Sequence, residues 1–288
     1  MRNYNSPLSR FLFKATRLYK QALGHSRNIV YFPIMHFVVL YGIFSHEYWY
    51  LVLPGIILLF YPVHQLGYSA GIHKCFAHNA FTPKKWYPYL STLVSSLTYL
   101  PNPLLAAGHH RIHHRYSDTD KDPHTPKHGF WHSYWLWTFN PLYKGTDCLK
   151  VTGDLNKRYP WMLKMVPYDI YIFYALQATI YYISFDLFVI INGVGLMSRH
   201  FAMWAAALAH GKNSEGEWVS LDRPWMARWI NPVMMHDEHH KHPERWDYSA
   251  YGIRDYGSYL IKYILSEDHN TLSNNVAPWD ESLAPWRK

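Results

Sequence analysis

Histidines gather in three short motifs along this chain of 288 residues, which holds 20 histidines in all. The motifs are His73-x-x-x-x-His78, His110-x-x-His113-His114 and His236-x-x-His239-His240. Neutral imidazole is the commonest metal ligand in proteins. On a helix, residues at i, i+3 and i+4 lie on one face, so the second and third motifs can each present three imidazoles together. The repeated pattern indicates one shared metal site.

The number of histidines indicates two metal ions, because a zinc ion takes only four ligands. An all-imidazole shell is compatible with Fe, Zn, Cu or Ni. His73 and His78 are about 140° apart on an α-helix, so we expect this pair to straddle the site rather than to chelate one ion. Polar residues beside the motifs could contact the ligand rings; the candidates are Asp118, Asp122, His124, Asp237 and Glu238.

Apolar runs predict four transmembrane helices, at about 29–44, 48–70, 170–185 and 187–209. Each run is close to the roughly 20 residues that cross a bilayer. The short polar turn at 45–47 has no Lys or Arg, whereas the opposite flanks are basic, so both termini are expected in the cytoplasm. We therefore predict an all-α membrane protein, a single domain over 1–288, whose cytoplasmic helical cap (71–166 and 210–288) holds a dimetal site.

Arg199 and His200 lie inside the fourth apolar run. Ionisable groups at such depth normally face a helix bundle or a cavity. The alternative is that the helix kinks or ends near these residues.

The composition narrows the classes of function. Aromatic residues make up 18% of the chain, as is typical of membrane interfaces and apolar tunnels. The net charge is +8, but the basic residues form no run with interleaved aromatics, so no nucleic-acid partner is expected. Cys75 and Cys148 have no paired spacing, which indicates a reducing compartment without disulfides.

The motifs and the residues that follow them resemble the membrane-bound fatty acid desaturases, specifically the stearoyl-type (delta-9) acyl desaturases. The resemblance rests on the three histidine motifs and on Asp118-Thr119 and Asp122-Pro123-His124, which follow the second motif. It implies nine metal ligands, of which the ninth, His210, lies at the cytoplasmic end of the fourth helix. The implied ligands are His73, His78, His110, His113, His114, His210, His236, His239 and His240.

The resemblance also implies an activity: an O2-dependent enzyme that inserts a cis double bond, at delta-9, into a saturated fatty acyl chain. Two Fe ions (Fe2+ in the reduced state) and the co-substrate O2 would do the chemistry, with no catalytic residue beyond the metal ligands. The acyl chain would be carried on coenzyme A, acyl carrier protein or a glycerolipid of the membrane. Tunnel walls are expected among Trp131, Trp135, Trp137 and Trp204.

An external electron donor is expected, such as a cytochrome b5 or a ferredoxin with its reductase. The haem-binding motif His-Pro-Gly-Gly is absent from the chain, so no fused cytochrome b5 domain is expected. A bacterial inner membrane is favoured over the endoplasmic reticulum.

Two positions depart from the family pattern. Ala206 stands where animal relatives have an Asn, and Asn231–Met235 replaces the usual Gly-Glu-Gly-Trp before the third motif. Two other functions stay open: a diiron hydroxylase acting on acyl chains or alkanes, and a zinc-dependent membrane hydrolase or receptor.

Overall fold

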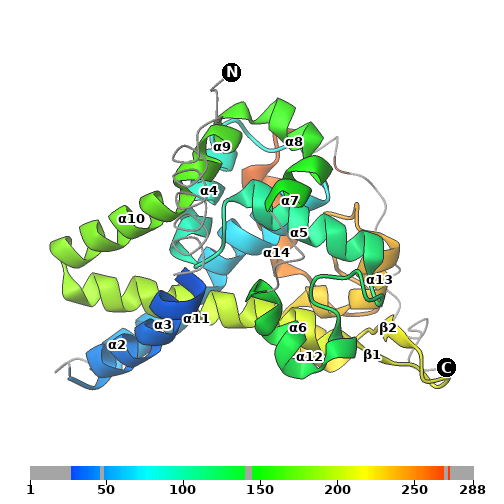
Figure 1. Cartoon of the computed structure of the whole chain (residues 1–288), viewed down its shortest axis with the longest axis horizontal. Coiled ribbons are helices and arrows are strands. Elements are labelled where there is room, and N and C mark those ends of the chain that lie inside the picture. Colours follow the sequence, from blue (N-terminus) through cyan, green and yellow to red (C-terminus); the bar gives the residue numbers. More distant parts are fainter. Residues whose placement is uncertain (1–26, 46–48, 140–144, 269–271, 273–288) are drawn as a thin grey trace, which may run out of the picture.

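The computed structural model describes residues 27–45, 49–139, 145–268 and 272. Helices dominate these residues (Figure 1). The α-helices are α2 Phe32–Ser45, α3 Trp49–His64, α4 Tyr87–Leu97, α5 Pro103–Tyr116, α6 Phe130–Tyr134, α7 Gly145–Val151, α8 Gly153–Arg158, α9 Pro160–Met165, α10 Asp169–Ile183, α11 Phe185–Leu208, α12 Pro224–Trp229, α13 His236–Lys241 and α14 Tyr256–Leu260; the strands are β1 His210–Lys212 and β2 Trp218–Ser220. Wider π-helical turns form Arg27–Tyr31, Gln65–Ala77 and Ile261–Leu265.

Three described helical segments are long and apolar enough to cross a membrane. They are Arg27–Ser45, Trp49–Ala77 and Phe185–Leu208, with 19, 29 and 24 residues. The first, second and fourth predicted spans are thus confirmed as long apolar helices. Helix α10, at the third predicted span, has only 15 residues, so the fourth crossing stays a prediction. Most of the predicted turn at 45–47 lies outside the described residues, as do residues 1–26, which contain the basic flank before the first predicted span.

Helix α11 is the centre of the apolar half of the molecule, where it packs against α2, α3 and α10 (Figure 1). Small residues allow these close approaches. A Cβ added to Gly193 of α11 would lie 2.5 Å from the Ile56 side chain of α3, and one added to Gly42 of α2 would collide with Val189 of α11. Membrane helices pack through such small residues because lipid gives no hydrophobic drive to associate.

A buried polar cluster ties α10 to α11. The Asn192 amide donates to Gln177 Oε1 of α10 over 2.9 Å and to the Phe188 carbonyl over 2.8 Å. Tyr99 donates to Asn192 Oδ1, and Tyr31 donates to Gln177 Oε1 over 3.1 Å. Polar groups among apolar helices need such partners, because leaving them unpaired is costly.

Arg199 and His200 face protein, as predicted. Helix α11 continues to Leu208, so the alternative that it ends near Arg199 is wrong. His200 Nε2 lies 2.6 Å from His36 Nε2 of α2, and its Nδ1 is hydrogen-bonded to the Tyr134 hydroxyl of α6. Arg199 is buried.

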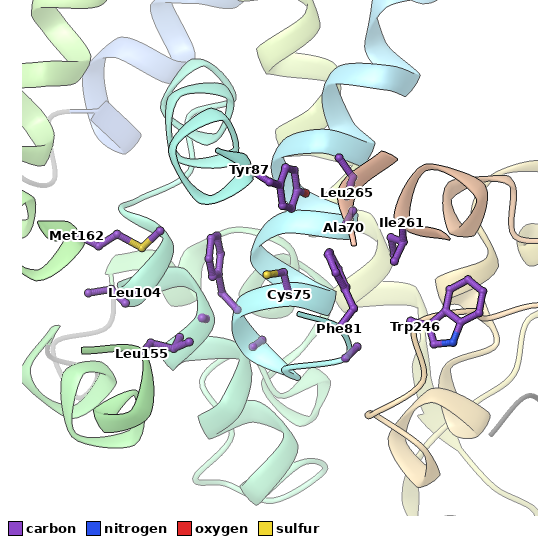
Figure 2. Close-up of a cluster of buried hydrophobic side chains, with 14 of the residues drawn as sticks. Ala70, Cys75, Phe81, Tyr87, Leu104, Leu155, Met162, Trp246, Ile261 and Leu265 are labelled. Atoms are coloured by element: carbon purple, nitrogen blue, oxygen red, sulfur yellow. The ribbon is translucent and has the colours of Figure 1, made fainter. Parts of the chain in front are cut away.

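A second buried core is built around the π-helical segment Gln65–Ala77, which continues α3. Side chains from α4, α5, α8, α9 and the segment Ile261–Leu265 surround it; Figure 2 shows Tyr87, Leu104, Leu155, Met162 and Leu265 converging near Cys75. The all-α prediction needs one correction. After α11 the chain forms a two-stranded antiparallel sheet in which His210 of β1 pairs with Ser220 of β2.

Helix α5 lies against α7 at Gly108, two residues before the second histidine motif. A Cβ on Gly108 would lie 2.5 Å from Cys148 Cβ, 2.6 Å from its Cα and 2.7 Å from its carbonyl oxygen. Backbone atoms are among these neighbours, so the contact has little room to relax.

We expect Gly108→Ala to lower the free energy of unfolding by about 1–3 kcal/mol, because overpacking of a close contact costs that much. The thermal midpoint in detergent measures it. Gly153→Ala at the start of α8 is the matched control, since its Cβ would meet nothing within 4 Å. Equal midpoints for the two variants would contradict the prediction.

Candidate metal centre

Helix α5 presents the second motif, and its start is fixed by ordinary capping. Asn102 Oδ1 accepts from the Leu104 amide over 3.0 Å, and Pro103 occupies the first helical position. Both residue types favour a helix start there. The Asn102 amide also donates to the Met162 carbonyl over 3.2 Å, which ties α5 to α9.

Arg111 joins α5 to the end of the first motif's helix. Its guanidinium donates to the carbonyls of Phe76 and Ala77 over 2.8 Å each, and it forms a 2.6 Å ion pair with Asp154. The last carbonyls of a helix have no partner within that helix, so an arginine there satisfies them. Nothing local to Arg111 in the sequence signals this role, because the contact is with a residue 34 positions away.

The first motif lies on a π-helical turn, which overturns our expectation that His73 and His78 straddle the site. The His78 amide donates to the His73 carbonyl over 3.1 Å, an i→i+5 bond. This bonding widens the turn to about 4.4 residues, so the two side chains stand roughly 50° apart instead of 140°. Their ring centroids are 4.9 Å apart, and both join one group of histidines.

The third motif forms α13, whose first turn is held by a residue from another segment of the chain. Asp222 Oδ1 accepts from the amides of Asp237 and Glu238 over 2.9 and 3.1 Å, so a carboxylate caps the first turn of this short helix. His210 is the first residue of β1, and the Leu221 amide donates to the Ala209 carbonyl over 2.8 Å beside it. The hairpin thereby holds His210 against α13.

The structure brings all nine predicted ligand histidines together in two adjoining groups. The five-histidine group holds His73, His78, His110, His114 and His239, and the four-histidine group holds His113, His210, His236 and His240. Within each group one nitrogen per residue lies within 4.8 Å of all the others. The His114 and His240 rings stack across the two groups with centroids 4.1 Å apart.

Each helical motif divides its histidines between the groups. Helix α5 gives its i and i+4 residues, His110 and His114, to the five-histidine group and His113 to the other. Helix α13 does the reverse: His236 and His240 enter the four-histidine group, and His239 enters the five-histidine group. The three imidazoles of one motif therefore do not all point the same way, contrary to our expectation. Successive residues on a helix diverge by about 100°, so neighbouring histidines of a motif enter different groups.

The facing nitrogens are spaced as in a metal shell. Nε2 atoms lie 2.9 Å apart in His78–His110, 3.0 Å in His114–His239 and His210–His236, and 3.2 Å in His113–His240. Two imidazole nitrogens bound to one ion at right angles, each at about 2.1 Å, would be about 3.0 Å apart. The two donor sets therefore fit two ions of the kind that imidazole prefers, such as Fe, Zn, Cu or Ni.

Carboxylates contact the opposite nitrogens of two rings in the four-histidine group. Asp122 Oδ2 lies 3.0 Å from His113 Nδ1, and Asp118 Oδ1 lies 3.0 Å from His210 Nδ1. Such contacts fix the tautomer, leaving Nε2 free for a metal. His124 packs on the His113 ring with centroids 4.1 Å apart. All three residues therefore lie where the sequence analysis places them, in contact with histidines of the site.

Asp237 and Glu238 point elsewhere, so the structure gives no support to our expectation that they contact ligand rings. Asp237 accepts from Ser220 over 3.0 Å and from Lys241 over 2.6 Å. Glu238 forms an ion pair with Arg245. The cause is helical geometry: these residues follow His236 by one and two positions and so leave the face that carries the motif.

Burial favours the neutral form of five imidazoles of the site. Desolvation first, and then neighbouring histidines, hold the pKa of His110, His113, His114, His236 and His239 well below its usual value. Burial also raises the pKa of Asp122 to about 7. Burial alone would raise the pKa of Asp118, but the hydrogen bond with His210 lowers it. Neutral imidazoles with converging lone pairs are ready to bind a cation.

The tryptophans expected to line a tunnel have different environments. Trp131 and Trp204 are 66% and 51% exposed, which does not fit a tunnel wall within the described residues. Trp135 packs on Phe32, and the Trp137 ring lies 5.4 Å from both His109 and His124. Among the four, Trp137 thus lies beside histidines next to the site.

A hollow of about 390 Å³ lies at the start of α12, lined by Leu208, Asp222, Arg223, Pro224, Trp225 and Met226.

The long apolar helices and the paired histidine groups define a membrane-associated protein with a candidate dimetal centre. No protein-family model matches the chain. The chain is similar to the delta-9 acyl-lipid desaturase 1 of Arabidopsis thaliana, with 28% identity over 221 residues, which are 73% of this chain and 71% of the relative. It is similar to the sn-1 stearoyl-lipid 9-desaturase of Anabaena variabilis, with 27% identity over 77% of this chain and 82% of the relative.

A third relative is named for a different double-bond position. The chloroplastic palmitoyl-monogalactosyldiacylglycerol delta-7 desaturase of Arabidopsis thaliana is 25% identical over 69% of this chain, and the match spans 56% of that relative. These relatives confirm the resemblance to desaturases that the histidine motifs indicate. The relatives are named as lipid desaturases, which are oxidoreductases.

We expect Asp122→Asn to weaken metal binding by about 10- to 100-fold, as loss of a carboxylate behind a ligand imidazole does. Titration of the metal-free protein with Fe2+ under anaerobic conditions measures it. Asp120→Asn is the matched control, because the Asp120 side chain is 81% exposed and belongs to neither histidine group. Equal affinities for the two variants would contradict the role given to Asp122.

Acid should destabilise the metal-free protein. The folded pKa values of the buried histidines lie below the value near 6.5 of the unfolded chain, so below about pH 6.5 the unfolded state binds more protons and is favoured. We expect the thermal midpoint to fall between pH 7.5 and 5.5. A midpoint that is constant or rises over this range would show that the histidines are not buried as neutral groups.

Proposed function

We propose that this chain is an O2-dependent acyl desaturase and that its two histidine groups hold two iron ions. The observation that carries the proposal is the convergence of nine imidazoles into two adjoining groups. Its chemical context is given by relatives named as acyl-lipid desaturases. Nine imidazole nitrogens exceed what one four-coordinate zinc would use, which favours this reading over a zinc-dependent hydrolase or receptor.

The reaction removes one hydrogen from each of two neighbouring methylenes. O2 is reduced to two water molecules, with two electrons and two protons supplied from outside. Unactivated methylenes offer no acidic proton, so the bound metal pair supplies the oxidising power and the protein supplies position. Asp118 and Asp122 hold the His210 and His113 rings, while Arg111 keeps the end of the first motif's helix against α5.

The substrate that we propose is an acyl chain of a membrane glycerolipid. Support comes from the names of the relatives, which act on acyl-lipids, and from the three long apolar helices beside the site. Delta-9 is the proposed position, because two of the three relatives carry it in their names. Because a third relative is named a delta-7 desaturase, the position of the double bond has to be mapped by experiment.

We propose that 1–288 forms one desaturase domain, that α10 completes four crossings, and that both termini lie on the cytoplasmic side with the cap. The long apolar helices support membrane insertion. The donor that we propose is a separate cytochrome b5 or ferredoxin with its reductase, in a bacterial inner membrane.

Expression in a host without its own desaturase tests the function. We expect the wild type to produce cis-unsaturated acyl chains in membrane lipid, with delta-9 as the main position in mass-spectrometric mapping. His113→Ala should abolish the product, with the protein still in the membrane, because His113 is the one residue shared by the four-histidine group and the Asp122 contact. His128→Ala is the control, since this half-exposed histidine lies outside the groups.

Three outcomes would contradict the proposal. A hydroxylated acyl chain without an alkene would indicate a hydroxylase that uses the same site. Product formation without O2 would exclude the oxidative reaction. Unsaturation that persists in His113→Ala would show that the ligand assignment is wrong. Unsaturation confined to acyl-coenzyme A or acyl carrier protein, instead of glycerolipid, would correct the substrate class.

A further inference from the structure

A buried ion pair lies directly behind the first histidine motif. Lys74 Nζ is 2.5 Å from Asp255 Oδ2, and the two side chains are 1% and 3% exposed. Lys74 follows His73 in the chain, whereas Asp255 comes from the segment before α14. Two charges are costly to bury unless their geometry is good and further hydrogen bonds satisfy them. The pair therefore calls for a reason beyond stability.

The hydrogen bonds around this pair also hold Tyr248. Asp255 Oδ2 accepts from the Tyr248 amide over 3.2 Å, and Asp255 Oδ1 accepts from the Gly257 amide over 2.9 Å. Lys74 Nζ lies 4.2 Å from the centroid of the Tyr248 ring, a cation–π distance. Tyr248 is thus fixed at its backbone by Asp255 and at its ring by Lys74.

Held in this way, Tyr248 contacts two ligands of the five-histidine group. Its hydroxyl oxygen lies 3.4 Å from His73 Nδ1. Its ring centroid lies 5.0 Å from that of His239 and 5.9 Å from that of His73. These two histidines are separated by more than 160 residues of chain, so Tyr248 bridges the first motif and the third.

We propose that Tyr248, held by Lys74 and Asp255, is a positioning residue of the five-histidine group. Its hydroxyl accepts from His73 Nδ1, which leaves His73 Nε2 for the ion, and its ring fixes the plane of His239. Asp118 and Asp122 do the equivalent work in the four-histidine group. The inference rests on the proposed dimetal function and adds to it that the two ions depend on different supporting residues.

Tyr248→Phe tests the proposal with little disturbance of packing. Wild type and variant are loaded with 57Fe2+ under anaerobic conditions and challenged with a chelator, and iron per chain is then measured together with the Mössbauer spectrum. We expect Tyr248→Phe to retain close to one ion where the wild type retains two, with loss of one of two spectral components. The affinity of the lost ion should fall by about 10-fold, the lower end for removal of such a partner.

Tyr87→Phe is the matched control. Tyr87 is fully buried, and its hydroxyl donates to the Leu66 carbonyl over 2.8 Å, on the same π-helical segment that carries His73. It removes a buried hydroxyl bond from the same helix without touching a histidine of the site, so we expect it to retain both ions. Lys74→Met with Asp255→Leu removes the whole pair without leaving one charge unpaired. This double variant should show the same selective loss as Tyr248→Phe.

Retention of two ions and an unchanged spectrum in Tyr248→Phe would overturn the inference. So would equal loss of both ions, because that would indicate a general structural role. A wild type that binds no iron would overturn both the inference and the proposed function. A wild type that binds two ions but makes no unsaturated product would overturn only the proposed reaction.

Discussion

Many imidazoles are buried together with their Nε2 atoms face to face, and the surrounding fold has to hold them in this arrangement. Nitrogens about 3 Å apart, as in His78–His110 and His210–His236, place lone pairs against each other. Adding protons is disfavoured, because burial and neighbouring rings lower the histidine pKa values. A metal cation between the nitrogens would resolve this conflict, and the surrounding fold would have to hold the rings in place to bind it.

The rings are held in place by contacts between segments that are distant in the chain. Gly108 lets α5 lie against α7, Arg111 binds the carbonyls at the end of the first motif's helix, and Asp222 caps α13. None of these residues belongs to either histidine group. Because α5 and α13 each supply both groups, a shift of either helix would disturb both at once. The supporting contacts therefore couple the two halves of the site.

Sequence reasoning could predict the parts of the site that local spacing encodes. The nine histidines, Asp118, Asp122 and His124 all stand where motif and resemblance place them. It could not predict the π-helical turn at His73–His78, because no residue type specifies i→i+5 bonding. Nor could it predict the β1–β2 hairpin, because strands of only three residues each are too short to show an alternating pattern. Arg111 and Asp222 contact segments that are distant from them in the chain, which no local pattern records.

The wide π-helical turn and the long apolar helix before it together connect the histidine site to the apolar half of the structure. Trp49–Ala77 is one helical segment, so His73 is rigidly connected to residues that are suited to a bilayer. His210 follows α11, the other long helix of this kind, by two residues. Two of the four segments that bring histidines to the site are thus the ends of apolar helices. Helices α5 and α13 supply the remaining histidines of both groups.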